Sequence, residues 1–185
     1  MAESPPLWRG RPRVILARPA DYWETLGAQL DPGVEVFWTG NQVCAASVSV
    51  ADIAGIATDL GRKPVLWDNY PVNDGAKACR YLHLAPLADR DPGLGEALAG
   101  HFCNPMNQAW LSRYPLAGLA ALYGGETPRL EDWFSPELAR RLGEDRAVFE
   151  EGGLDGMTSG RRDELADIYA GFDDPAAAEV VEWLR

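Results

Sequence analysis

The sequence is poor in the side chains on which many metal and redox sites depend: among its 185 residues are only two histidines and three cysteines. Cys44, Cys79 and Cys103 are far apart, form no CxxC motif and have no histidine at a metal-ligand spacing. Scattered cysteines in odd number are typical of free, buried thiols in a reducing cytoplasm. His83 and His101 also lack a partner at a useful spacing, so both are expected to be structural or surface residues. We therefore expect no metal and no other cofactor.

Positive charge and long apolar runs are scarce as well. The 17 Lys and Arg stand against 28 Asp and Glu, a formal net charge of −11, and such a field repels nucleic acid and anionic membranes. No apolar run approaches the roughly 20 residues that cross a bilayer, and the first residues lack the apolar core of a signal peptide. A cytoplasmic location is expected. What the chain does have is 46% hydrophobic residues, enough for a domain with a core.

Short apolar runs alternate with helical patterns along the first two thirds of the chain. Strands are predicted at residues 13–17 (RVILA), 34–38 (VEVFW), 64–67 (PVLW) and 102–103. Helices are predicted at residues 19–30, 49–60 and 91–100. Ser49 and Asp52 form a capping box, Gly61 is placed as a C-cap, and Asp91 with Pro92 begins the third helix. These repeats predict an α/β fold of about four parallel β/α units, which make half of an eight-stranded barrel or a small open sheet.

After residue 115 the pattern is helical only. Helices are predicted at residues 116–123, 136–149, 161–169 and 175–184. We therefore divide the chain into a leader (1–12), a β/α domain (13–125) and a helical C-terminal region (126–185). Asp173 and Asp174 precede Pro175 and an alanine-rich run, so this pair is interpreted as a helix N-cap.

Aromatic and amide side chains gather after three of the predicted strands. The clusters are residues 38–41 (WTGN), 67–74 (WDNYPVND) and 104–108 (NPMNQ). In parallel α/β folds the loops that follow the strands hold the ligand. Amides and carboxylates pair with hydroxyl groups, and Trp or Tyr packs on the C–H face of a ring. The clusters therefore indicate a site for a neutral sugar.

Four segments that carry these clusters resemble glycoside hydrolase family 84, the O-GlcNAcase- and hyaluronidase-like β-N-acetylglucosaminidases. They are residues 37–40 (FWTG), 61–74 (GRKPVLWDNYPVND), 84–94 (LAPLADRDPGL) and 104–120 (NPMNQAWLSRYPLAGLA). Their order and spacing match the family, so the chain resembles the second half of its (β/α)8 TIM barrel, followed by a helical tail. The resemblance implies a glycosidase-family protein of carbohydrate metabolism that recognises terminal β-linked N-acetylglucosamine on a glycan or glycoprotein.

The resemblance also implies a role for each of four residues. Trp67 would form part of the pocket wall around the N-acetyl group, and Asn69 would hydrogen-bond near the reacting end of the sugar. Asp74 would accept hydrogen bonds from the 4- and 6-hydroxyls, and Asn104 would contact another ring hydroxyl. The alternative is a local structural role: Asn69 as a turn former, Asp74 as a helix N-cap and Trp67 as a core residue.

The catalytic residues implied by the resemblance are not found in the sequence. The family's reaction is retaining and substrate-assisted, with two adjacent aspartates after the fourth barrel strand that orient the acetamido group and move the proton. If residues 13–17 correspond to the fifth strand, that pair lies outside this sequence, and no catalytic residue is assigned. The family also has a pocket tyrosine after its fifth strand; Tyr22 is either that residue or an ordinary helix position.

Three functions therefore stay open. The chain is an N-acetylglucosaminidase whose N-terminal half is supplied elsewhere or lost, or a non-catalytic half barrel that binds the sugar, or a structural remnant without a ligand. The site residues favour retained sugar recognition over the third. A half barrel would leave unpaired edge strands and an open apolar inner face. We therefore expect either a homodimer or a sheet covered by the C-terminal helices.

Overall fold

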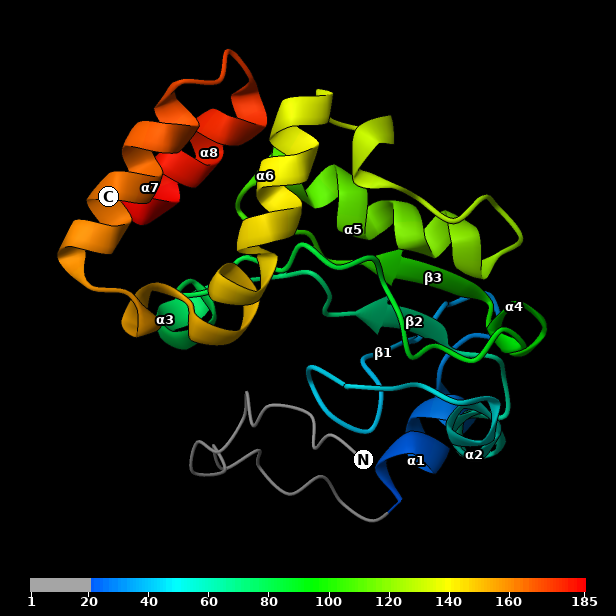
Figure 1. The fold of residues 1–185 in the computed structure, drawn as a ribbon. Helices are drawn as coiled ribbons and strands as arrows, with labels where there is room; N and C mark the ends of the chain where they lie inside the picture. Colours follow the sequence, from blue (N-terminus) through cyan, green and yellow to red (C-terminus); the bar gives the residue numbers. More distant parts are fainter. Residues whose placement is uncertain (1–20) are drawn as a thin grey trace, which may run out of the picture.

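A sheet of three parallel strands, in the order β1-β2-β3, lies at the centre of the computed structural model, which describes residues 21–185 (Figure 1). The strands are β1 (Phe37–Trp38), β2 (Val65–Asp68) and β3 (Gly100–Cys103). All three predicted strands in the described part are present, β1 shorter than predicted and β3 longer. The strand predicted at residues 13–17 lies outside the described residues. The α/β class with parallel strands is thus confirmed, and the carboxyl ends of the strands meet at one edge of the sheet.

Helix α2 (Val50–Leu60) connects β1 to β2 and forms where its caps predict it. Ser49 Oγ accepts a hydrogen bond from the backbone N–H of Asp52 at 3.1 Å, and the Asp52 carboxylate accepts one from the Ser49 N–H at 3.0 Å. Gly61 ends the helix at φ 62°, a left-handed conformation that glycine adopts without strain. The apolar side of the helix is buried through Ile53, Ile56 and Leu60.

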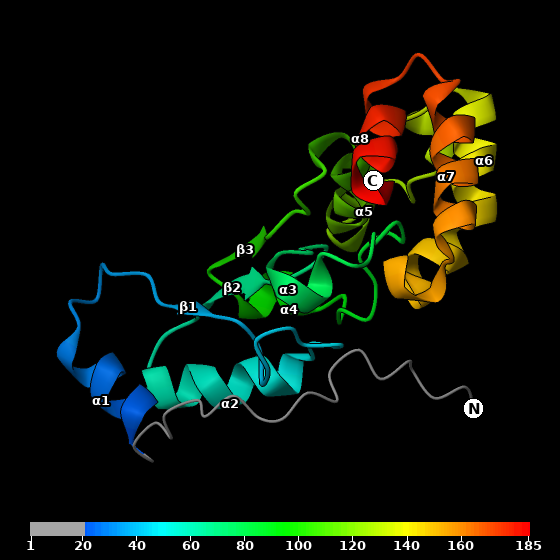
Figure 2. The same ribbon diagram turned by 90° about the vertical axis from the view of Figure 1, so that its left-hand side faces the viewer.

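Helix α1 (Tyr22–Gln29) precedes β1 and packs against α2 (Figure 2). The helix predicted at residues 19–30 is therefore confirmed from Tyr22 to Gln29, while residues 19 and 20 lie outside the described residues. Arg62, just before β2, donates hydrogen bonds of 2.8–3.1 Å to four backbone carbonyl oxygens. One belongs to Gly27 in α1, and the others belong to Leu30, Asp31 and Val34 in the segment that follows α1. Arg62 therefore fixes α1 at the amino ends of the strands, away from the loops that follow them.

The helix predicted at residues 91–100 is largely wrong. Helix α4 (Leu94–Ala97) is a single turn, and β3 begins at Gly100. The Asp91 carboxylate accepts hydrogen bonds from the backbone N–H of Gly93 at 2.9 Å and of Val50 at 3.3 Å. Asp91 therefore makes a local turn and contacts the first residue of α2 instead of capping a long helix of its own.

Helix α5 (Ala109–Leu122) begins well before the predicted start at residue 116 and contains Pro115. Its first turn is capped from the C-terminal region. The Glu179 carboxylate accepts hydrogen bonds from the backbone N–H groups of Trp110 at 3.0 Å and Leu111 at 2.9 Å. A cap 69 positions downstream leaves no local signal, which is why the helix start was predicted too late.

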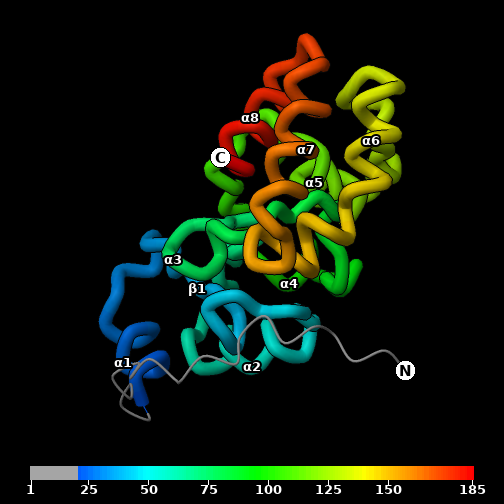
Figure 3. The backbone as a smooth tube through the Cα atoms, turned by 60° about the vertical axis from the view of Figure 1, so that its left-hand side comes forward, coloured from blue at the N-terminus to red at the C-terminus, as the bar shows by residue number. Residues whose placement is uncertain are grey.

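The helices predicted at residues 136–149, 161–169 and 175–184 are present, whereas α3, η1 and η3 were not predicted. The remaining elements are α3 (Gly75–Ala78), η1 (Leu130–Asp132), α6 (Pro136–Ala147), η2 (Val148–Gly152), η3 (Leu154–Gly156), α7 (Ser159–Ala170) and α8 (Pro175–Leu184). Asp174 Oδ1 accepts a hydrogen bond from the Ala176 N–H at 2.8 Å, so the Asp173–Asp174 pair is the helix cap that its sequence context predicts. Helices α5 to α8 gather at one end of the molecule, and α1 and α2 at the other (Figure 3).

Two hydrophobic cores hold these parts together. The smaller one lies between the sheet and α1, α2 and α4, and includes Trp38 and Leu66. The larger one joins the C-terminal helices to the loops between the strands, since it contains Leu82 and Met106 as well as Trp183. The division of the chain after residue 125 stays a prediction, although the C-terminal helices share their core with the loops. In the part of the chain from residue 21 onward, no helix is long and apolar enough to cross a membrane.

Within residues 21–185, no element covers one face of the sheet. Phe37, Trp67 and Phe102 lie on it, 47%, 42% and 57% exposed, and the Phe37 ring contacts the other two at centroid distances of 5.8 and 5.6 Å. The expectation that the C-terminal helices cover this face is wrong, because their apolar sides pack into the larger core instead.

Candidate functional site

Three loops converge at the carboxyl edge of the sheet. They follow β1, β2 and β3, and we refer to them as the first loop (residues 39–48), the second loop (69–74) and the third loop (104–108). The backbone N–H of Asn104 donates to the Asp68 carbonyl oxygen at 2.8 Å, so the second and third loops leave the sheet side by side. All three sugar-type clusters expected from the sequence thus share one edge.

Asn69 is the centre of a hydrogen-bond network among these loops. Its Oδ1 accepts from Trp67 Nε1 at 2.9 Å and from Asn104 Nδ2 at 3.1 Å, while its Nδ2 donates to the Val43 carbonyl oxygen at 2.6 Å. Asn104 Oδ1 has no hydrogen-bond partner among residues 21–185, and each of the two amides keeps one unpaired N–H. Three of the four predicted site residues therefore come together, and two of them, Asn69 and Asn104, retain hydrogen-bonding groups for a ligand, whereas the Trp67 N–H is used within the network.

The sequence left two local structural roles open, Trp67 as a core residue and Asp74 as a helix N-cap, and the structure supports neither in full. Trp67 is 42% exposed on the open face and is therefore not a core residue. Asp74 occupies the N-cap position of α3, but its side chain makes no capping hydrogen bond and is exposed to solvent. Asp74 has no hydrogen bond to the other three predicted residues. Its charge nevertheless reaches the first loop: together with burial, the larger cause, it raises the pKa of the Cys44 thiol.

Asn73, the neighbour of Asp74, has a structural role. It is 1% exposed; its Nδ2 donates to Gln108 Oε1 at 2.8 Å and to the Tyr81 carbonyl oxygen at 3.0 Å. Its Oδ1 accepts from the backbone N–H of Asn107 at 2.9 Å. Asn73 therefore ties the second loop to the third, and its buried amide is fully used by the protein itself.

A buried charged cluster beneath the network was missed by the sequence reasoning. Asp68 forms a bidentate pair with Arg90 at 2.6 and 2.7 Å, and its carboxylate also contacts His101 Nε2 at 3.1 Å. Burial alone would raise the pKa of Asp68, but the hydrogen bonds and charges of Arg90 and His101 outweigh it and hold this pKa below its usual value. The expectation that His101 has no partner is wrong, since it lies between Asp68 and Tyr123. Strand alternation was the available signal, because it places Asp68 on the face opposite Trp67.

Part of this charged cluster could also be considered as a metal site. Its carboxylate, however, is already paired with Arg90, which makes it less suitable for a metal ion. Asp68, His101 and Cys103 have ligand atoms within 4.8 Å of one another. The Arg90 guanidinium already binds both carboxylate oxygens of Asp68. Burial raises the pKa of the Cys103 thiol to about 12, which keeps it protonated and a poor ligand. We assign no metal to these residues.

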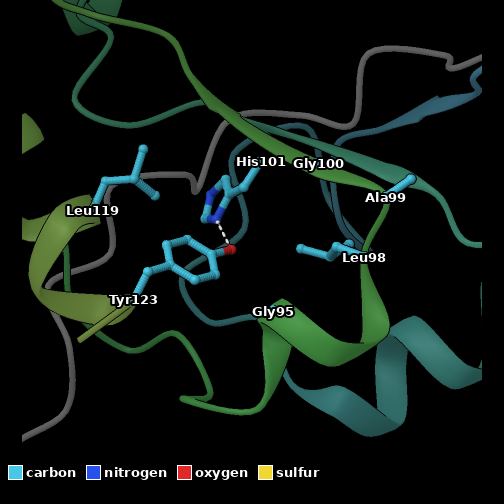
Figure 4. A pocket seen from close by; sticks show the side chains of 7 residues that line it. All are labelled: Gly95, Leu98, Ala99, Gly100, His101, Leu119 and Tyr123. Atoms are coloured by element: carbon cyan, nitrogen blue, oxygen red, sulfur yellow. Dashed lines mark hydrogen bonds between the residues drawn. The ribbon is translucent and has the colours of Figure 1, made fainter.

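Two cavities lie away from the Asn69 network, and the second of them includes Asn41 of the first loop. One, of about 310 Å³, is open to solvent and is lined by residues of α4, α5 and the start of β3, where the His101 and Tyr123 side chains meet at 2.9 Å (Figure 4). The other, of about 360 Å³, lies against α2 and includes Trp23 and Asp59. None of the four predicted site residues lines either cavity. Asn69 and Asn104 are both half-buried, so the network is partly accessible to solvent.

A protein family and individual relatives that match this chain both point to the family that the sequence resembles. The β-N-acetylglucosaminidase family matches residues 14–131. Protein O-GlcNAcase of Rattus norvegicus and of Mus musculus is in each case 37% identical to this chain over 84 residues, which are 45% of this chain and 9% of the relative. The matched segment thus spans less than a tenth of these curated relatives.

Two solved structures share the fold over much of the chain. A mutant of the O-GlcNAc hydrolase of Thermobaculum terrenum is similar with a TM-score of 0.57 and 25% identity, covering 88% of this chain and 43% of that protein. The protein CpGH84B is similar with a TM-score of 0.52 and 27% identity, covering 84% of this chain and 29% of the other. Because the family match covers more than half of the sequence, the chain belongs to the β-N-acetylglucosaminidase family, glycoside hydrolase family 84.

Proposed function

We propose that this chain binds a terminal β-linked N-acetylglucosamine at the carboxyl edge of its sheet. The observation that carries the proposal is the Asn69 network, which joins three loops and leaves one N–H of each amide, and Asn104 Oδ1, without a partner among the described residues. An amide that is held by its neighbours loses little conformational freedom when a hydroxyl binds to it. The half-exposed Trp67 ring beside it offers an apolar wall for an acetyl methyl group.

Asp74 would supply the charged contact of this site. A carboxylate can accept hydrogen bonds from two neighbouring hydroxyl groups at once, and hydrogen bonds to charged groups are the stronger kind. Its side chain is free to do so, because it is exposed and does not cap α3. We assign it the 4- and 6-hydroxyls of the sugar, Asn104 another ring hydroxyl and Asn69 the reacting end.

We propose that this chain binds the sugar without cleaving it unaided. The substrate-assisted reaction requires an adjacent pair of aspartates at a strand end. The pair Asp173–Asp174 begins α8, where Asp174 is occupied as a helix cap, so it is not suited to that role. Residues 13–17 would add a fourth β/α unit beside β1, which would make the sheet the second half of a barrel. Catalysis would then require aspartates contributed from outside these four units. The natural ligand would be a glycan or glycoprotein, and a cytoplasmic location stays a prediction.

Calorimetric titration with N-acetylglucosamine, and with an inhibitor that mimics its oxazoline, tests the binding. Asp74→Ala should weaken either ligand by about 10- to 150-fold, the value of a hydrogen bond to a charged group. Asp167→Ala is the matched control, since Asp167 is equally exposed but lies on α7. Equal affinity of wild type and Asp74→Ala would overturn the assigned role, and absence of binding by either ligand would favour a structural remnant.

Hydrolysis of a fluorogenic aryl β-N-acetylglucosaminide, followed between about pH 4 and pH 8, tests the second half of the proposal. No turnover is expected from the purified chain. Turnover that Asp74→Ala abolishes would show that the chain recruits a catalytic carboxylate, and the binding-only proposal would be wrong.

A further inference from the structure

We propose that Arg90 is a positioning residue for the sugar-binding loops: by clamping Asp68 to the first loop it holds the Asn69 amide and the Trp67 indole in place. The inference rests on the proposed function for the ligand that these side chains serve. The positioning itself is a property of the protein without ligand, and it is tested separately below.

The contacts of Arg90 bring together two separate segments. Its Nε and Nη2 bind the two carboxylate oxygens of Asp68 at 2.6 and 2.7 Å, and its Nη1 and Nη2 donate to the carbonyl oxygens of Ala46 at 3.0 Å and Ala45 at 3.1 Å. The Arg90 side chain is only 4% exposed. One planar group therefore fixes the distance between the end of β2 and the first loop.

Both segments carry the Asn69 network. Asp68 stands between Trp67 and Asn69 in the chain, with its side chain on the opposite face, so its position determines the backbone from which both neighbours project. Ala45 follows Val43 by two residues, and the Val43 carbonyl oxygen accepts the Asn69 amide at 2.6 Å. A shift of the first loop relative to β2 would break this hydrogen bond and release the amide.

Arg90 is itself held firmly. The backbone around it pairs with Val48, whose N–H donates to the Asp89 carbonyl oxygen at 3.2 Å and whose carbonyl accepts from the Asp91 N–H at 3.0 Å. Behind it, α5 packs so closely that a Cβ at Gly118 would lie 2.4 Å from the Leu87 nitrogen. The segment that carries Arg90 therefore has little room to move when a ligand binds.

A lysine could not replace this arrangement. The guanidinium offers five N–H donors in a fixed plane, and here they serve a bidentate carboxylate and carbonyl oxygens on the other side. An ammonium group would keep the charge that balances Asp68 but would lose the fork. Arg90→Lys therefore separates positioning from simple charge compensation.

The test compares Arg90→Lys with Arg62→Lys, a matched control because Arg62 also donates to four backbone carbonyls but at the amino ends of the strands. In ¹⁵N NMR spectra without ligand, the Trp67 indole and Asn69 side-chain amide signals should shift and exchange faster with water in Arg90→Lys only. Calorimetry should then show about a tenfold or greater loss of affinity for the oxazoline-mimicking inhibitor in Arg90→Lys, and less than about twofold in Arg62→Lys. If Arg90→Lys does not fold, Asp68→Asn should give the same changes.

Unchanged Trp67 and Asn69 signals in Arg90→Lys would overturn the inference, and so would equal changes in both lysine variants, since these would reflect general loosening. If the signals move as expected but the wild type binds neither inhibitor nor N-acetylglucosamine, the positioning role stands and the proposed function fails.

Discussion

Asn69→Ala removes the centre of the loop network, and its cost can be worked out from three contacts. The substitution deprives Trp67 Nε1 and Asn104 Nδ2 of their acceptor and the Val43 carbonyl oxygen of its donor. A hydrogen bond contributes about 1 kcal/mol net, and water can reach this half-exposed site and replace part of each bond. We therefore expect a loss of about 2 kcal/mol in the free energy of unfolding, less than the sum of three average bonds.

Urea unfolding followed by circular dichroism measures this loss. Asn107→Ala is the control, because Asn107 is exposed in the third loop and its side chain makes no hydrogen bond among the described residues. Its cost should stay within about 0.5 kcal/mol, as for other surface positions. If Asn69→Ala cost no more than Asn107→Ala, the network would not be a stabilising unit, and the reasoning that it presents a fixed amide to the sugar would be refuted.

Three further predictions concern parts of the fold that support the site. Arg90 and His101 hold the pKa of Asp68 below the ordinary value of an aspartate, so the charged form stabilises the fold near neutral pH and this stability should be lost in acid, as the pH falls through the lowered pKa. Asp68→Asn should unfold more easily at pH 7 by about 3–5 kcal/mol and show a smaller loss in acid, and an unchanged acid profile would contradict this. Glu179→Ala should lower the free energy of unfolding, measured in urea, by about 1 kcal/mol, because Glu179 of α8 caps α5. Glu182→Ala, at an exposed position of α8, should lower it by almost nothing, and equal losses would exclude the cap. The open aromatic face should make the chain a dimer that Phe102→Glu disperses, so a 20.2 kDa monomer in light scattering of the wild type would rule out self-association.

Local sequence signals predicted those elements whose ends are determined locally. The capping box of Ser49 and Asp52 located α2, and Asp174 with Pro175 located α8. Elements whose boundaries depend on distant residues were predicted poorly. The start of α5 depends on Glu179, and Asp91 caps no helix of its own because its carboxylate contacts the start of α2.

The same distinction applies to the candidate site. Motif context brought Trp67, Asn69 and Asn104 forward as site residues, and Trp67 and Asn104 both donate hydrogen bonds to Asn69. Strand alternation could have placed Asp68 beneath the site, but its pairing with Arg90 spans 22 positions and has no local pattern, so the partner could be found only in three dimensions.

Titration of the ¹⁵N-labelled chain with N-acetylglucosamine tests the central claim most directly, because it reports at the site residues themselves. The proposed site predicts saturable shifts of the Trp67 indole signal and of the Asn69 and Asn104 side-chain amide signals, with much smaller shifts for glucose, which lacks the acetamido group. Shifts confined to other parts of the chain, or none at saturating sugar, would contradict the assignment of these loops as a sugar-binding site.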